Sequence, residues 1–148
     1  MKTRSILFNR LIISSILCLY LFFFLFLLQP FDSINYNHPY KTVQLFGYGL
    51  ISFFSYFITD TFSSAKKLKF NKNFVVFFLL GSSLCFVYNT LIINHKSIKI
   101  AGFFFWIITY ALPVFVTMLP IIYFSKKINF YEKFYYTFFP KIKLTGDN

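Results

Sequence analysis

The chain has 148 residues, of which 57% are hydrophobic, 25% are aromatic and only 13% are charged. Soluble domains average about 25% charged residues, so this composition excludes an ordinary soluble domain and predicts a membrane protein. The net charge of +11 reflects 15 lysines and arginines against 4 acidic residues.

Four apolar runs follow one another along the chain, and each is long enough to cross a bilayer. A hydrocarbon core about 30 Å thick requires about 20 helical residues. The only formal charge inside the runs is Asp60, and the runs cover residues 11–28, 43–62, 74–93 and 100–124. Short connections favour antiparallel neighbours. We therefore predict an all-α integral membrane protein. Residues 1–124 would form an antiparallel four-transmembrane-helix bundle, and residues 125–148 a cytoplasmic juxtamembrane linker.

The first run follows basic residues, as the apolar region of a secretory signal does. Signal peptides, however, have an apolar region of about 7–15 residues and a small-residue cleavage site. This run is longer and ends in Gln29, Pro30 and Phe31. We therefore predict an uncleaved first span. The stretch QPFDSINYNHPY after it is predicted to be a polar loop, because its prolines and asparagines favour turns.

Lysines and arginines are unequally distributed between the two sides of this topology. Twelve lie before the first span, between the second and third, or after the fourth, whereas the other two loops hold Lys41, Lys96 and Lys99. The basic side of a membrane protein stays in the cytoplasm, so both termini are predicted to be cytoplasmic. The inner residues expected to contact anionic lipids are Lys66, Lys67, Lys69, Lys126, Lys127 and Lys133.

Polar and small residues gather in the outer half of the predicted bundle. An asparagine in hydrocarbon seeks an interhelical hydrogen bond, and glycines let helices approach closely. These residues either pack the helices or form a small outward-facing pocket under the first loop. The cluster comprises Gln29, Pro30, Phe31, Asn35, Gly47, Tyr48, Gly49, Asn89 and Tyr110.

The fourth run and the residues after it contain two further features. Pro113 and Pro120 lie on roughly one face of the run, and each removes a backbone donor, so we predict either a static bend or a kink that transmits a signal. After the run, Phe130, Phe134 and Phe138 recur every four residues among lysines. This pattern predicts a basic aromatic helix in the inner interface.

No catalytic, metal-binding or cofactor-binding constellation is recognisable, so we predict a protein that is not an enzyme and has no cofactor. Cys18 and Cys85 fall inside predicted spans, and His38 and His95 fall in the two outer loops. We interpret the cysteines as small apolar fillers and the histidines as loop residues. Asp60 is interpreted as an interfacial residue near Lys66 and Lys67.

Several short motifs occur along the chain in an order that resembles that of a known family. They are LLQPF, then LFGYGLISF, then FVYN, and an LP dipeptide in the fourth span. This arrangement is similar to the membrane-embedded N-terminal region of bacterial LytTR-family transcriptional regulators. The matching positions are Pro30, Phe31, Gly47, Tyr48, Gly49, Asn89 and Pro120. The connection SSAKKLKFNKNF lacks the tryptophan and glutamate expected in relatives.

The resemblance implies a location in the bacterial inner membrane, a homodimer and a cytoplasmic DNA-binding domain after the fourth span. Because the 148 residues end about where that domain would begin, they are interpreted as a truncated regulator or a membrane module alone, with no DNA-binding residues. The hypothesis is an anchor and sensor for an unidentified small-molecule or membrane signal. The alternatives are a small four-span transporter or channel subunit, and an accessory subunit of a membrane complex.

Overall fold

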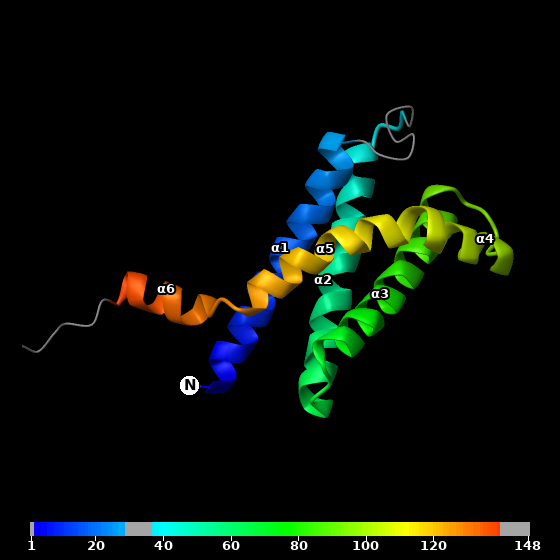
Figure 1. Cartoon of the computed structure of the whole chain (residues 1–148). Helices are drawn as coiled ribbons and strands as arrows, with labels where there is room; N and C mark the ends of the chain where they lie inside the picture. Colours follow the sequence, from blue (N-terminus) through cyan, green and yellow to red (C-terminus); the bar gives the residue numbers. More distant parts are fainter. Residues whose placement is uncertain (1, 29–36, 140–148) are drawn as a thin grey trace, which may run out of the picture.

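The computed structural model describes residues 2–28 and 37–139, and this part of the chain is all-helical. Four helices are long and apolar enough to cross a membrane (Figure 1). The first two are α1 (Lys2–Leu28) and α2 (Lys41–Lys66). The third combines α3 (Phe70–Val87) with the π-helical segment η2 (Tyr88–Ile93). The fourth combines α4 (Ile100–Trp106), the π-helical segment η3 (Ile107–Ala111) and α5 (Leu112–Lys126).

The helices extend beyond the apolar runs, most clearly at the start of the chain. The first run was expected to begin at residue 11, whereas α1 begins at Lys2. Hydropathy marks only the part of a helix that suits hydrocarbon, and the backbone hydrogen bonds continue into the flanking polar residues. The end of α2 is defined by Lys67, which has a left-handed backbone conformation with a φ of 51°.

The first two helices pack along each other and approach closely at Gly49. Their buried residues recur every three or four positions, as in helices that pack at a shallow angle. Those of α1 are Arg10, Ile13, Ser14, Leu17, Cys18 and Leu21, and those of α2 are Leu45, Gly49, Ser52, Ser55, Tyr56, Thr59 and Ser63. A Cβ atom on Gly49 would lie 2.7 Å from the backbone oxygen of Cys18. The helices approach this closely because Gly49 has no side chain.

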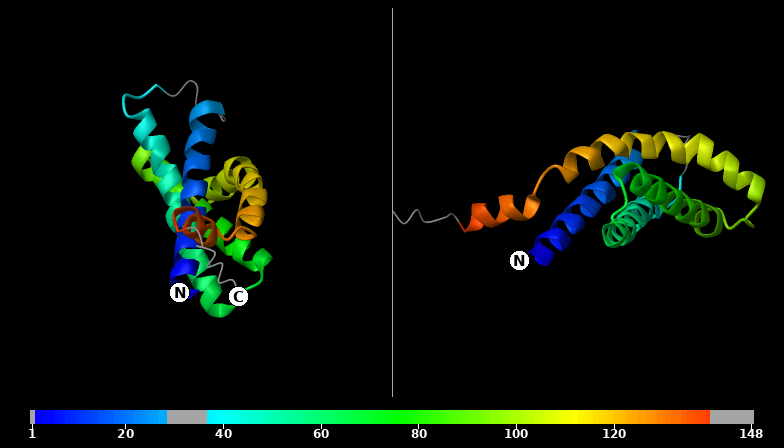
Figure 2. Two further views of the ribbon diagram at one scale, coloured as in Figure 1. Left: turned by 90° about the vertical axis from the view of Figure 1, so that its left-hand side faces the viewer. Right: turned by 60° about the horizontal axis from the view of Figure 1, so that its bottom comes forward.

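The fourth helix crosses the others instead of lying along them (Figure 1). Its buried face completes one apolar core with the first three helices. The residues of this face are Ala111, Val114, Phe115, Met118 and Ile122. Its path is curved (Figure 2). The segment η3 ends at Ala111, two residues before Pro113, and the N–H of Leu112 donates to the carbonyl of Ile107. A wide turn at this point accommodates a proline that lacks an N–H group.

The outer surface of the four helices is strongly apolar. Leu19, Phe54, Leu79 and Phe105 are each at least half exposed. An apolar surface on every side of a bundle would drive aggregation in water and is what a lipid environment requires. The structure and the composition together therefore indicate a multi-pass membrane protein.

The expected amphipathic helix after the fourth span is α6 (Phe130–Phe138). Asn129 caps its first turn, where the side chain Oδ1 accepts a hydrogen bond from the N–H of Glu132 at 3.4 Å. Figure 1 shows α6 extending away from the spans on the side where α1 begins. This helix is the last described element of the chain.

Candidate functional site

Two polar clusters lie at opposite ends of α2. We call the first the tyrosine cluster, consisting of Tyr48, Tyr88 and Asn89. The hydroxyl of Tyr48 donates to Oδ1 of Asn89 at 2.9 Å. The hydroxyl of Tyr88 donates to the backbone oxygen of Gln44 at 2.9 Å. The two tyrosine rings meet edge to face at a centroid distance of 5.0 Å. These contacts join the beginning of α2 to the end of the third span.

The tyrosine cluster coincides with η2, the π-helical segment that begins at Tyr88. The side chain Nδ2 of Asn94 donates to the backbone oxygen of Asn89 at 2.8 Å and to its Oδ1 at 3.2 Å. Single π-helical turns interrupt the regular helix ladder and occur frequently at functional sites. The sequence predicted a role for Asn89, but no sequence signal indicated the π-helical turn around it.

The other residues of the predicted outer cluster have different positions. Gly47 faces the ring of Tyr88, so it belongs beside the tyrosine cluster. Gly49 faces Cys18 of α1 and therefore serves helix packing. Tyr110 lies in η3 and makes ring contacts with Phe105 and Trp106 of its own span. Gln29, Pro30, Phe31 and Asn35 lie outside the described residues.

We call the second cluster the ionic cluster, which consists of Arg10, Asp60 and Lys126. Nε of Arg10 donates to Oδ2 of Asp60 at 2.9 Å, and Nζ of Lys126 lies 3.0 Å from Oδ1. The side chains of Arg10 and Asp60 are only 9% and 16% exposed. Nη2 of Arg10 also donates to the hydroxyl of Ser64 at 3.2 Å. One carboxylate thus joins α1, α2 and α5.

The expected neighbours of Asp60 were Lys66 and Lys67, and its ion pairs in the described structure are instead with Arg10 and Lys126. Lys66 is six residues further along α2, so its side chain leaves the helix on another face. Its ammonium group lies over the ring of Phe62, 4.4 Å from the centroid. The sequence signal for the ionic cluster was present, because a lone carboxylate in an apolar run requires a cationic partner.

The remaining basic residues predicted to contact lipids are exposed. Lys127 lies over the ring of Tyr123, 4.2 Å from the centroid. Lys126 is partly exposed, and its ammonium group pairs with Asp60. Contact of these side chains with anionic lipids stays a prediction, and the exposed set is Lys66, Lys67, Lys69, Lys127 and Lys133.

The tail helix α6 contacts α1 close to the ionic cluster. Nδ2 of Asn9 donates to Oδ1 of Asn129 at 3.0 Å, and the N–H of Tyr131 donates to Oδ1 of Asn9 at 2.9 Å. The ring of Phe8 meets those of Tyr131 and Phe134 at 5.8 and 5.7 Å. Asn9 and Arg10 are adjacent, so one turn of α1 contacts both the ionic cluster and the tail.

Among residues 2–28 and 37–139, no group of three or more histidine, cysteine or acidic side chains could hold a metal ion. Cys18 and Cys85 are buried thiols without a disulfide. The described polar and aromatic side chains instead form hydrogen bonds, ion pairs and aromatic contacts between helices.

Comparison with known proteins finds no matching family model, curated protein or solved structure. Membership of the LytTR family consequently stays a prediction from the sequence motifs.

Proposed function

We propose that the chain is the membrane anchor and sensor module of a LytTR-type transcriptional regulator. Its four spans would form an antiparallel bundle in the bacterial inner membrane, in which the fourth helix crosses the other three at an angle (Figure 1). Both termini would lie in the cytoplasm, and two copies would associate as a homodimer. The observation that supports this proposal best is the ionic cluster. It joins the end of the last span to the first two spans through Lys126, immediately before the tail that would lead to a cytoplasmic partner domain.

The proposed mechanism uses the fourth helix as the moving element. Met118 and Ile122 pack it in the apolar core, and Lys126 attaches its end to Asp60. A signal that displaces this helix would change the Lys126 contact and the position of α6 against Asn9. Such a signal acts only if it binds the two helix arrangements with different affinities. The tyrosine cluster is the proposed detecting end, since its hydrogen bonds join two spans.

The proposed topology predicts a specific pattern of cysteine labelling. Ser97 and Ala65 are exposed in loops or helix ends that the basic-residue count assigns to opposite faces. In intact cells, a membrane-impermeant maleimide is expected to label Ser97→Cys, whereas Ala65→Cys should react only after permeabilisation. Native background should be low because Cys18 and Cys85 are buried. Labelling of Ala65→Cys in intact cells would contradict the proposed orientation.

The sensor role predicts that a small change in the tyrosine cluster alters an output at the tail. The DNA-binding domain of a characterised LytTR regulator is joined after Asn148, and transcription from its promoter is measured in cells. Tyr48→Phe removes the hydroxyl that donates to Asn89. We expect it to change transcription at least about fivefold, the lower end of typical allosteric coupling.

The matched control for this experiment is Tyr123→Phe, which removes an exposed tyrosine hydroxyl from the fourth helix. It is expected to leave transcription unchanged, with equal amounts of each fusion protein in the membrane by immunoblot. Equal transcription from wild type and Tyr48→Phe would show that the tyrosine cluster does not control the tail, which would count against the sensor role.

A second candidate function is a small transporter or channel subunit. The ionic cluster favours it, because buried ionisable residues in membrane helices often mark pathways for ions or substrates. Flux of a solute into liposomes that contain the purified chain, and loss of that flux in Asp60→Asn, would replace the sensor proposal with this one. An accessory role in a larger complex would be revealed by a stoichiometric partner that co-purifies in mild detergent.

A further inference from the structure

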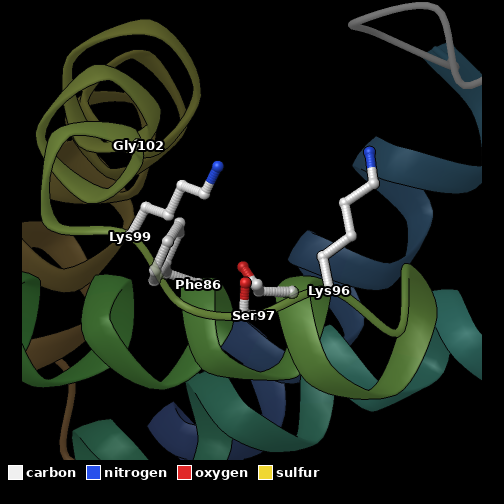
Figure 3. Close-up of a pocket in the computed structure, with 6 residues that line it drawn as sticks. Phe86, Lys96, Ser97, Lys99 and Gly102 are labelled. Atoms are coloured by element: carbon white, nitrogen blue, oxygen red, sulfur yellow. The ribbon is translucent and has the colours of Figure 1, made fainter.

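A hollow of about 340 Å³ lies where the third and fourth spans meet at their connecting loop. Its lining residues are Phe86, Thr90, Lys96, Ser97, Lys99 and Gly102. Lys96 and Lys99 extend on either side of Ser97, and Phe86 lies beside Lys99 (Figure 3). The N–H of Lys96 donates to the backbone oxygen of Thr90 at 2.8 Å, which holds the loop against η2.

The charge of this hollow is not neutralised within the described residues. Lys96 and Lys99 are exposed, and no described side chain forms an ion pair with either of them. The acidic residues of the described chain are Asp60, which belongs to the ionic cluster, and Glu132 of α6. Within the described residues, two ammonium groups and a hydroxyl therefore line the hollow without an ion-pair partner, together with the apolar ring of Phe86.

The position of the two lysines indicates the kind of anion. Each lies within a few residues of a span, since the third ends at Ile93 and the fourth begins at Ile100. Lysines at such positions lie at the level of the lipid head groups. We propose that the hollow is a binding site for a phosphate group carried by an amphiphile, with the phosphate at Lys96, Lys99 and Ser97 and the apolar part against Phe86.

A molecule bound in this hollow would be the signal for the proposed sensor. That role rests on the proposed function, whereas binding in the hollow does not depend on it. Thr90 belongs to η2, the segment that carries Asn89 of the tyrosine cluster. The ring of Phe86 contacts Phe103 and Trp106 of the fourth span at 5.2 and 5.8 Å. A molecule in the hollow would therefore touch both of the spans that contain π-helical segments.

Trp106 offers a direct test because it is the single tryptophan of the chain. The full chain in dodecyl maltoside micelles is titrated with dihexanoyl phosphatidylglycerol while Trp106 fluorescence is measured. We expect a saturable change in the wild type. In the double variant Lys96→Gln with Lys99→Gln, the apparent affinity should fall about 30-fold, from the usual contribution of a lysine near anionic lipid. Both residues are exposed, so the variant should fold normally.

The matched control is Lys2→Gln with Arg4→Gln, which removes the same charge from exposed positions at the beginning of α1, outside the predicted lipid contacts. Its affinity should change less than about threefold, because a distant exposed charge is screened. If only phosphatidylglycerol gives a saturable change in Trp106 fluorescence, the bound phosphate group comes from a lipid head group. If inorganic phosphate also gives one, the site binds a free phosphate compound. An equal loss in both double variants, or no saturable change with either probe, would overturn the site. Because this readout needs no transcription, a negative result here is separate from failure of the sensor proposal.

Discussion

Asp60→Asn is expected to lower the free energy of unfolding by about 3 kcal/mol, because it leaves two cations without their shared carboxylate. The larger cost comes from the unpaired Arg10, since its side chain is only 9% exposed and its guanidinium group cannot be hydrated in place. The measurement is the fraction of sodium dodecyl sulfate in mixed micelles at which the buried thiols of Cys18 and Cys85 become reactive. That fraction should be clearly lower in the variant than in the wild type.

The matched control for this prediction is Glu132→Gln, the same chemical change at an exposed carboxylate of α6. It should alter stability by no more than about 0.5 kcal/mol. A double-mutant cycle with Arg10→Gln isolates the pair, and the coupling energy should be about 1–3 kcal/mol. Additive effects of Arg10→Gln and Asp60→Asn would mean that the ion pair makes no contribution of its own.

Gly49→Ala is expected to destabilise the chain by about 2 kcal/mol, although alanine is the better helix former. The added Cβ atom would lie 2.7 Å from the backbone oxygen of Cys18. A backbone atom cannot rotate away, so α1 and α2 would have to separate. The same detergent titration measures this effect, and Cys18 should become reactive before Cys85, because it lies directly opposite the substitution.

Gly102→Ala provides the matched glycine control. A Cβ atom there meets no atom within 4 Å. This variant should therefore be neutral or stabilised by up to about 1 kcal/mol through helix propensity. Equal stability of the Gly49 and Gly102 variants would show that the close approach of α1 and α2 is not required.

Hydropathy correctly predicted four helices that are long and apolar enough to cross a membrane, because hydrocarbon demands only that a segment be long and apolar. The aromatic helix after the fourth span was predicted for a similar reason, since Phe130, Phe134 and Phe138 repeat with the period of a helix. The exact limits were less predictable. Helix α1 begins nine residues before its apolar run at Leu11, because backbone hydrogen bonding does not stop where hydrophobicity does.

The two polar clusters were predictable to different degrees. Asn89 stood out in an apolar run, and the structure gives it a hydrogen bond from Tyr48. Nothing in the sequence identified Tyr88 as a member, since tyrosine is common throughout this chain. The prolines indicated irregularity in the fourth span, where η3 precedes Pro113. The π-helical turn η2 has no proline and therefore had no local signal.

By itself the sequence determined a multi-pass helical membrane protein and the distribution of its basic residues, because both depend on local composition. Only the tertiary structure decided which charges meet. Arg10 and Asp60 are separated by 50 residues and Lys126 lies 66 residues further on, so their pairing depends on how each helix is rotated about its axis. The close approach of Gly49 to Cys18 and the crossing of the fourth helix constrain that rotation, and neither can be read from a single segment.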